Sequence, residues 1–391
     1  MSRAVALLLL VACSDPPPAV RPIITEQPDP PIGNAERGAD LVITYECARC
    51  HEGVGEAPDL QKQCAGCHED ILDGTLEVPE GQHWREHIHS LPSAPDLSAA
   101  HRFLPDWIAE FLQRPHDLRP HLEATMPRLA IDERDARDLA AYLTRDAPER
   151  EGWPRGDAER GRAAVEARAC GGCHLAEGRA IGEAPAVEGL ARTLAPDLAV
   201  AAQRFRRDML IDWLIDPAAL HPGTRMPAQG IECDEAKDIT AYILTLELPA
   251  PAPAPARLPV LEREVLFDEV ETQVFRAVCW HCHADPDLAM GDGGPGNTGG
   301  FGFPARRVNL GEYESIQSGA LDTEGRRASL FREVTLNGEA MPLIVATLRA
   351  RQLEQAGVEH DGPRGMPLGL PAMSPESIQL VETWIAQGRP N

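Results

Sequence analysis

The stretch Cys47-Ala-Arg-Cys50-His51 is followed, after twelve intervening residues, by Cys64-Ala-Gly-Cys67-His68. The same pattern returns as Cys170-Gly-Gly-Cys173-His174 and as Cys279-Trp-His-Cys282-His283. Two thiols three residues apart can add to the two vinyl groups of one haem, while the next imidazole reaches its iron. These four copies use eight of the ten cysteines in the chain. The sequence therefore predicts four covalently attached c-type haems.

Zinc sites, disulfides and redox dithiols are the other chemistries that paired cysteines can serve. A redox dithiol explains each Cys-x-x-Cys pair but not the histidine that follows every one of them. We therefore assign the eight motif cysteines to haem attachment and the four motif histidines to the proximal side of the iron. The attachment residues are Cys47, Cys50, Cys64, Cys67, Cys170, Cys173, Cys279 and Cys282, and the proximal ligands are His51, His68, His174 and His283.

The composition limits the domain count and the partners. A chain of 391 residues is long enough for two to four domains. Only 5% of its residues are aromatic, so each core would be thin unless a large apolar haem completed it. The net charge of −24, with only two lysines, argues against nucleic acid and favours a redox protein partner that presents a basic docking patch.

The N-terminus has the features of an export signal. Arg3 precedes an apolar run over residues 4–12 that is too short to span a bilayer. The run ends in Leu10-Val11-Ala12-Cys13, which resembles the lipobox of bacterial lipoproteins. The resemblance implies that residues 1–12 are removed, that Cys13 is lipidated, and that the protein is anchored in the periplasm, with Ser14 favouring the outer membrane. The alternative is an ordinary signal peptide that happens to contain a cysteine.

Proline-rich stretches divide the remaining chain. Residues 13–33 contain seven prolines and are predicted to form an extended tether. Residues 249–259 include Pro249-Ala-Pro-Ala-Pro-Ala-Pro255 and read as a linker. A shorter break with Gly152 and two prolines precedes residue 155. The predicted domains are therefore 34–148, 155–248 and 260–391.

The first two predicted domains share an internal repeat. Gly33-Asn-Ala-Glu-Arg-Gly38 returns 123 residues later as Gly156-Asp-Ala-Glu-Arg-Gly161. Gly55-Glu-Ala-Pro58 returns after 127 residues, whereas Ala94-Pro-Asp-Leu97 returns after only 101, as Ala195-Pro-Asp-Leu198. The difference of 26 residues places an insertion between Pro58 and Ala94, which is where the second haem motif lies. The first domain is thus the pattern of the second with a haem-bearing insertion.

Hydrophobic periodicity and capping residues predict a mainly α fold without strand-rich segments. Helices capped by Asn34 and Asp157 should lead into the first and third haem motifs. Closing helices are expected to begin at Asp132, at Asp234 and at Ser374-Pro375. Each predicted domain therefore has a helix before its haem motif and another at its end.

All three predicted domains resemble the small helical, monohaem cytochrome c domain, in which a Met-Pro loop between the haem motif and the closing helix supplies a sulfur ligand. The resemblance implies three such domains in tandem. It also implies that Met126 and Met226, which hold matching places in the repeat, ligate the irons of their own domains. The competing interpretation is that either methionine is ordinary core.

Two distal ligands are less sharply indicated. In the third domain Met341, Met366 and Met373 compete, and we favour Met366 because it lies just before the closing helix. The insertion contains no methionine but carries His83, His87 and His89. Ligation by two histidines is therefore expected there, with His89 preferred and His83 next.

Two further features of the sequence are given ordinary structural interpretations. Cys233 is read as a small buried residue, although an intermolecular disulfide is possible. The glycine-rich run 291–300 lacks the ending of a P-loop and the acidic spacing of an EF-hand. It is read as a flexible loop at a haem edge.

The functional expectation is electron transfer rather than catalysis. If every iron has two protein ligands, no position is left for a substrate. The alternative from another class is a haem enzyme, such as a peroxidase or a sulfur-compound oxidoreductase, which would need one iron with an open or labile distal face. The inserted haem and the third domain are the candidates for that role.

Overall fold

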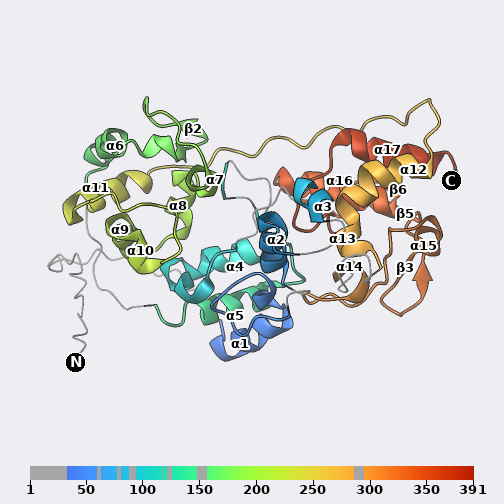
Figure 1. Cartoon of the computed structure of the whole chain (residues 1–391), viewed down its shortest axis with the longest axis horizontal. Coiled ribbons are helices and arrows are strands. Elements are labelled where there is room, and N and C mark those ends of the chain that lie inside the picture. Colours follow the sequence, from blue (N-terminus) through green and yellow to red (C-terminus); the bar gives the residue numbers. More distant parts are fainter. Residues whose placement is uncertain are drawn as a thin grey trace.

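The computed structural model describes residues 33–59, 63–76, 81–87, 94–116, 118–120, 126–147, 156–285 and 295–391. Within these ranges the chain is mainly helical, as predicted (Figure 1). The strands of this described part form three small antiparallel pairs. They are β1 (Leu175–Ala176) with β2 (Arg179–Ala180), β3 (Ala320–Leu321) with β4 (Arg327–Ala328), and β5 (Glu333–Leu336) with β6 (Glu339–Pro342).

The buried apolar residues gather into three cores, each with its own set of helices. The first unit contains α1 (Ala35–Thr44), η3 (Leu97–Arg102), α4 (Pro105–Gln113) and α5 (Glu133–Leu143) around the first core. The second unit contains α6 (Ala158–Ala167), α7 (Leu190–Leu194), α8 (Leu198–Arg204), α9 (Arg207–Ile215), α10 (Pro217–Leu220) and α11 (Cys233–Ile243).

The third unit is larger and less regular. Its elements are α12 (Phe267–Val270), η5 (Glu271–Cys279), α13 (Trp280–His283), α14 (Pro295–Thr298), α15 (Tyr313–Ser318), α16 (Leu343–Gln355) and α17 (Pro375–Ala386). Helix η5 is a π-helix, and its neighbouring residues Val274 and Phe275 are both almost fully buried in the third core.

The helix starts agree closely with the capping residues in the sequence. Asn34 and Asp157 accept hydrogen bonds from Arg37 N and Arg160 N at 3.0 and 2.9 Å. Asp132 caps α5, and Ser374 caps α17 with Pro375 in its first turn. The closing helix of the second unit differs slightly, because it begins at Cys233 after Glu232 rather than at Asp234.

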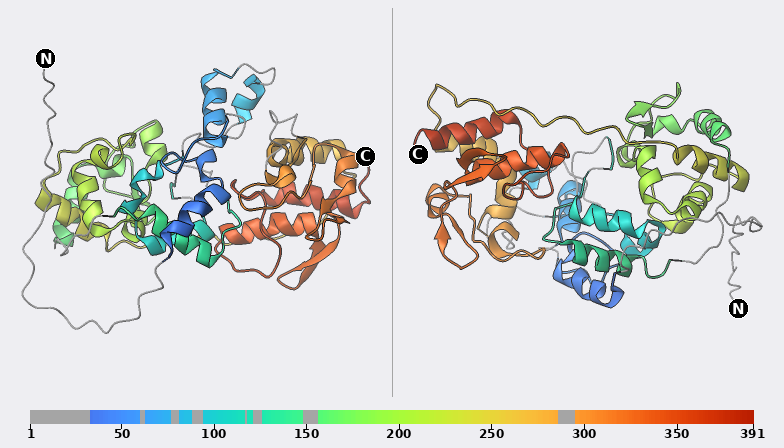
Figure 2. Two further views of the ribbon diagram at one scale, coloured as in Figure 1. Left: turned by 90° about the horizontal axis from the view of Figure 1, so that it is seen from below. Right: turned by 180° about the vertical axis from the view of Figure 1, so that it is seen from behind.

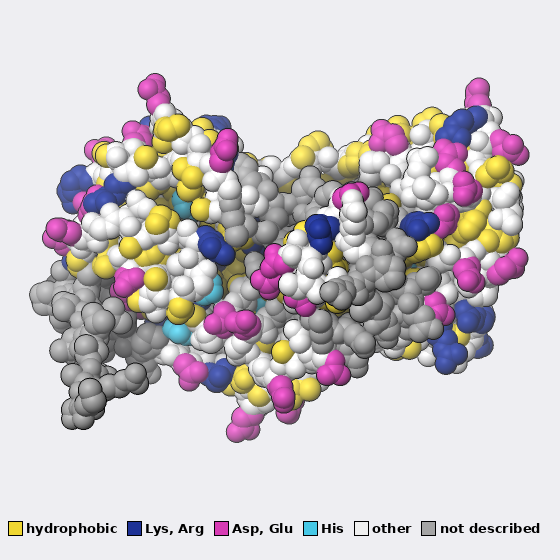
Figure 3. Space-filling view, in the orientation of Figure 1, with side chains coloured by type: hydrophobic (Ala, Val, Ile, Leu, Met, Phe, Trp, Pro, Cys, Tyr) yellow, Lys and Arg dark blue, Asp and Glu magenta, His cyan; other side chains and the backbone are white. Residues whose placement is uncertain are grey.

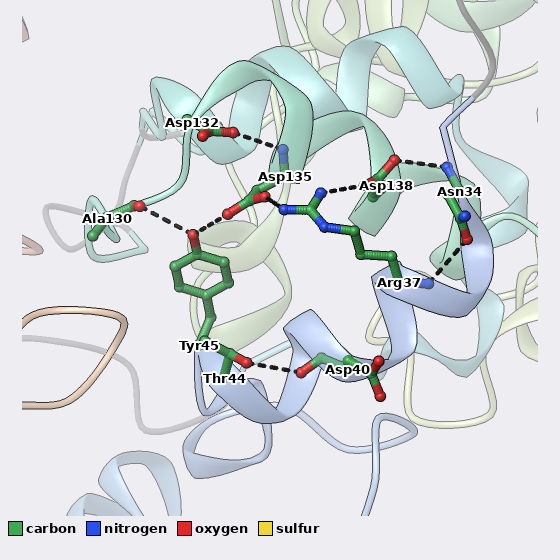
Figure 4. Close-up of polar contacts among 9 residues, drawn as sticks. All are labelled: Asn34, Arg37, Asp40, Thr44, Tyr45, Ala130, Asp132, Asp135 and Asp138. Atoms are coloured by element: carbon green, nitrogen blue, oxygen red, sulfur yellow. Dashed lines mark hydrogen bonds and ion pairs between the residues drawn. The ribbon is translucent and has the colours of Figure 1, made fainter.

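A polar junction fixes α1 against α5 (Figure 4). The Arg37 guanidinium forms ion pairs with Asp135 and Asp138, and Asn34 N donates to Asp138 Oδ1 at 2.6 Å. Burial would raise the pKa of Asp138, but the hydrogen bonds from Asn34 and Arg37 hold that pKa below its usual value. Tyr45 donates to Asp135 Oδ2 at 2.5 Å. The junction therefore sets the angle at which the first and last helices of this unit meet.

The second unit repeats this junction between α6 and α11. Arg160 Nε lies 2.7 Å from Asp238 Oδ2, and Asp157 N donates to Asp238 Oδ1 at 2.7 Å. Gly161 lies at the point of closest approach, where an added Cβ would collide with the backbone of Asp238. Gly38 has the same place against Asp138 in the first unit. These contacts explain why the glycine and the arginine recur together in the repeated sequence.

The first unit lies between the other two, so the order in space is not the order in sequence (Figures 1 and 2). Residues 249–259 run as an extended segment from the second unit to the third. Phe301 of the third unit packs into the first core, and its N–H donates to Glu46 Oε2 at 3.2 Å. The part of the glycine-rich run that is described, 295–300, thus leads into a docking contact; residues 286–294 lie outside the described part.

The insertion forms a helical pair that projects from the first unit (Figure 2). Its helices are α2 (Cys64–Asp73) and α3 (Gly81–His87), joined by a hydrogen bond from Arg85 Nε to Ile71 O at 3.0 Å. No described residue of α2 or α3 belongs to the first core. The first core is therefore formed without the insertion.

The surface carries many more acidic than basic side chains, and on the face in Figure 3 Asp and Glu are spread widely rather than gathered into one patch. In the part of the chain that the structure covers, every helix is too short or too polar to cross a lipid bilayer.

Candidate haem sites

One continuous cavity reaches all four Cys-x-x-Cys-His motifs. Its volume is about 2420 Å³, whereas a pocket for one drug-sized ligand has roughly 300–1,000 Å³. It passes through all three units and is lined mainly by apolar side chains, among them Trp107, Phe111 and Leu139. All four motif histidines line it: His51, His68, His174 and His283. A connected apolar space of this size has room for several haems. These haems would supply the apolar bulk that the low aromatic content leaves missing.

The first and third motifs share one backbone geometry. Cys47 opens η1 (Cys47–Arg49) and Cys170 opens η4 (Cys170–Gly172). Each follows a residue in the left-handed region, Glu46 or Ala169, at φ 53° and 55°. The motif histidine N–H then donates to the first cysteine's carbonyl, at 3.0 Å for His51 and 2.9 Å for His174. This turn brings the two thiols and the imidazole to the same cavity wall.

The second and fourth motifs are helical instead. Cys64, Cys67 and His68 form the start of α2, and Cys282 and His283 lie in α13 directly after the π-helix. The two geometries show that the spacing of the motif does not by itself dictate one backbone conformation.

The proximal histidines of the first two units are oriented by proline carbonyls. His51 Nδ1 lies 2.9 Å from Pro95 O, and His174 Nδ1 lies 2.8 Å from Pro196 O. A carbonyl oxygen can only accept, so Nδ1 carries the proton and Nε2 is left with the lone pair that a metal requires. Burial lowers the pKa of both histidines, opposed by these hydrogen bonds, and keeps the imidazoles neutral.

These prolines belong to the repeated Ala-Pro-Asp-Leu sequence, so this part of the repeat orients the motif histidine in both units; the sequence alone indicated only how the two domains align. Asp96 Oδ1 and Asp197 Oδ1 each accept from the N–H two residues onward, at 2.8 Å. The aspartate thus fixes the turn that presents the proline carbonyl to the imidazole.

The third unit contains a diverged copy of this element, Val308-Asn309-Leu310. Asn309 Oδ1 accepts from Gly311 N at 2.8 Å, as the two aspartates do from their own turns. Leu310 N donates to His283 O at 2.6 Å. Burial lowers the pKa of His283 to about 4, with the backbone of Val308 and Gly296 opposing the shift. Only one of the four residue types is retained, which is why the sequence alone did not reveal this copy.

The motif thiols have the properties of attachment sites rather than of a redox pair. None of Cys47, Cys50, Cys67, Cys170, Cys173, Cys279 and Cys282 forms a disulfide. Burial raises the pKa of Cys47 to about 11 and that of Cys279 to about 12. A redox-active dithiol requires a lowered thiol pKa, so these environments disfavour that alternative.

Met126 and Met226 both lie on the cavity wall, beside the first and second cores. Trp213 Nε1 donates to Met226 Sδ at 3.0 Å. The residue at the equivalent place of α4 is Phe111, which has no donor. The two methionines therefore share a position but differ in what contacts the sulfur.

The cavity distinguishes the three candidate methionines of the third unit. Met366 and Met373 line it, whereas Met341 lies in β6, is only 3% exposed and packs in the third core. Met366 is held by a hydrogen bond from its N–H to Thr347 O at 2.9 Å.

Several predicted residues fall outside the described part. His89 and Cys13 lie in undescribed ranges, and the side chains of Cys64, His83 and His87 are not described, although their backbone is helical. Cys233 is disulfide-bonded and only partly buried, so its reading as a plain buried residue was wrong. His221, a half-buried loop residue, also lines the cavity.

Comparison with known proteins supports the assignment for one unit. Residues 158–247 match the family model for Cytochrome c. That range covers the second unit from α6 to beyond α11, including its haem motif and Met226. No curated protein and no solved structure matches the chain significantly.

The fold and the site therefore define a c-type cytochrome domain. Such a domain binds haem c covalently through its two motif cysteines and serves haem-based electron transfer. In the second unit Cys170 and Cys173 would hold the haem and His174 would ligate its iron, and Met226 lines the same cavity.

Proposed function

We propose that the chain is a tetrahaem c-type cytochrome that passes single electrons between redox partners. In this proposal 34–148, 155–248 and 260–391 are three cytochrome c-like domains, the first carrying two haems. The observation that carries the proposal is the single cavity shared by four motifs. Separate haem proteins joined only by linkers would have separate pockets.

The position of the first unit suggests the route that electrons take through the protein. It contacts the second unit through Phe103 and Phe205, which form an isolated antiparallel bridge. It contacts the third unit through the two candidate Met-Pro loops, where Arg128 N donates to Leu368 O at 3.1 Å. Electrons would therefore pass between the second and third units by way of the first, which acts as the junction.

The proposed ligands divide the haems into two kinds. Met126, Met226 and Met366 would complete three irons, and His89 would complete the iron of the insertion. Methionine ligation raises the haem potential, so the inserted haem should have the lowest of the four. With two protein ligands on each of the four irons, no position would be left for a substrate, which favours electron transfer over the enzyme alternative.

The cellular setting is also proposed. A signal over residues 1–12 and a lipidated Cys13 would place the protein on the periplasmic side of a bacterial membrane, the outer membrane being favoured. The acidic surface, with a net charge of −24, would suit a redox partner that offers a basic patch.

A redox titration followed by absorbance, with and without carbon monoxide, tests the function. The proposal predicts four one-electron waves and no carbon monoxide adduct of the reduced protein at neutral pH without denaturant. Rapid formation of an adduct at one haem would support the enzyme alternative instead.

A further inference from the structure

The first and second units meet around an approximate two-fold axis. Leu104 N donates to Arg204 O at 2.8 Å, and Arg206 N donates to Arg102 O at 3.0 Å. The corresponding residues of the two units are 102 positions apart in the chain, so Arg102 corresponds to Arg204 and Leu104 to Arg206. On the axis the Phe103 and Phe205 rings pack edge to face, with centroids 5.0 Å apart. Equivalent segments of the repeat thus pair with each other.

Two arginines flank this axis and line the cavity. Arg102, only 4% exposed, lies over the Phe103 ring at 4.5 Å and over Trp213 of the second unit at 5.8 Å. Arg204 lies over the rings of Phe103 and Phe205, at 5.2 and 5.3 Å. Each guanidinium therefore contacts an aromatic ring of the opposite unit.

Neither guanidinium forms an ion pair with an acid among the described residues. Arg102 donates to Ala99 O at 2.7 Å, and the Nε atoms of both arginines are buried without a hydrogen-bond partner. The nearby acid Asp96 instead accepts from Ser98 N and Ser98 Oγ, at 2.8 and 2.9 Å. Burial lowers the pKa of Arg102 to about 10 and that of Arg204 to about 9, with Arg102 contributing to the lowering at Arg204.

Buried cations of this kind require an anion, because an unpaired buried charge is costly. The haem that each motif would attach bears two propionate carboxylates, and guanidinium is the side chain best suited to bind carboxylates. Arg204 also contributes to the lowered pKa of His174, which places it near the proximal side of the second haem site. The chemistry of the cavity wall therefore fits propionates at this interface.

We propose that Arg102 and Arg204 form a shared carboxylate-binding junction, in which propionates of the haems attached at Cys47 and at Cys170 meet across the interface between the first and second units. This inference rests on the proposed function and adds to it the place where two of the four haems would interact. Each arginine would stabilise both haems, its own and that of the other unit.

The test is the effect of Arg102→Gln, a change in the first unit, on the haem of the second. The wave of the second unit is identified as the one that Met226→Ala moves. Removing the Arg102 charge should lower that wave, since the ferric state loses a repelling cation. We expect a change of about tenfold in its reduction equilibrium constant, which is about 59 mV for one electron. Arg204→Gln should likewise lower the wave that Met126→Ala moves.

Matched variants separate charge from structure. Arg162→Gln on α6 removes the same charge from a side chain that is 69% exposed and should leave all waves in place. Arg102→Lys keeps the positive charge, so the second unit's wave should stay close to its potential in the unmodified chain; this variant also provides the measurement if the glutamine variant misfolds. All variants should retain the haem count of the unmodified chain, because the thioether bonds are untouched.

The inference is overturned if Arg102→Gln moves only the first unit's wave, or moves the second no more than Arg162→Gln does. It is also overturned if Arg102→Lys shifts the second wave as far as the glutamine variant. Either result in a chain that carries four haems would leave the proposed function intact. Fewer than four haems in the unmodified chain would instead count against the proposed function.

Discussion

Replacing Gly161 by alanine should destabilise the second unit, although the same change in an ordinary helix stabilises it. Gly161 lies in the middle of α6, where alanine has a helix propensity about 1 kcal/mol more favourable than glycine. At this position, however, the new Cβ would lie 2.5 Å from Asp238 C and 3.0 Å from Ile239 N. Carbon atoms pack comfortably only at about 3.5–4.0 Å. Helices α6 and α11 must therefore separate by about 1 Å.

The size of the effect follows from what that separation disturbs. The obstructing atoms are backbone, so no side chain can rotate away, and the cost belongs at the upper end of about 1–3 kcal/mol for overpacking. A gap of this width also weakens the packing of Val165 and Ile239, both almost fully buried. After the gain in propensity, a net loss of about 2 kcal/mol remains. For a unit of this size each kcal/mol lowers Tm by about 4–8 °C.

Guanidinium unfolding combined with peptide-resolved hydrogen exchange can assign this loss to α6 and α11. Ala163→Gly, on the exposed face of the same helix, is the matched control and should cost about 1 kcal/mol through propensity alone. Gly161→Ala should therefore be the more damaging of the two, although it is nominally the favourable substitution. A neutral or stabilising Gly161→Ala would refute the helix crossing.

Four further outcomes follow from the same structure. Met226→Ala should abolish one far-red sulfur–iron band and lower one potential in the visible redox titration, while the fold measured by circular dichroism persists; an unchanged spectrum would make Met226 core. Trp213→Phe should lower the same potential by a smaller amount, since a donor to the sulfur reduces its electron donation, and an unchanged wave would contradict that role. Cys13→Ser should move the protein into the soluble fraction after a salt wash, whereas retention would exclude the lipid anchor. Replacing 59–93 by 186–194 should leave a folded first unit with one haem fewer by mass, and an unfolded unit would show that the inserted haem is part of its core.

Much of the fold could be predicted because its signals are local. Capping side chains act within one turn of helix, so Asn34, Asp157 and Ser374 identified three helix starts from sequence alone. The repeat likewise revealed that Gly161 and Arg160 matter, since they return together. The repeat could not show why these two residues matter, because their partner Asp238 is 78 residues from Arg160 in the chain. Contacts over that separation depend on how helices cross and leave no local pattern.

The relative order of the units could not be predicted. Their order in sequence suggests a row in which the second unit is central, whereas Phe301 and Phe205 both dock on the first. Phe301 directly follows the glycine-rich run 291–300, which is predicted to be a loop, and a single apolar residue has no periodicity that would mark it as part of a core. The π-helical turn of η5 could not be predicted either, because hydrophobic periodicity indicates a helix but not the width of its turns.

The central claim is that all four motifs carry haem in one connected cavity. The most direct measurement is the intact mass of the denatured protein after maturation in a host that attaches c-type haem, with each attachment located by peptide mapping. We expect the mass of the processed chain plus four haems, one on each motif, including the motif that contains Cys64 and Cys67. A fully matured chain carrying three haems or fewer would contradict it.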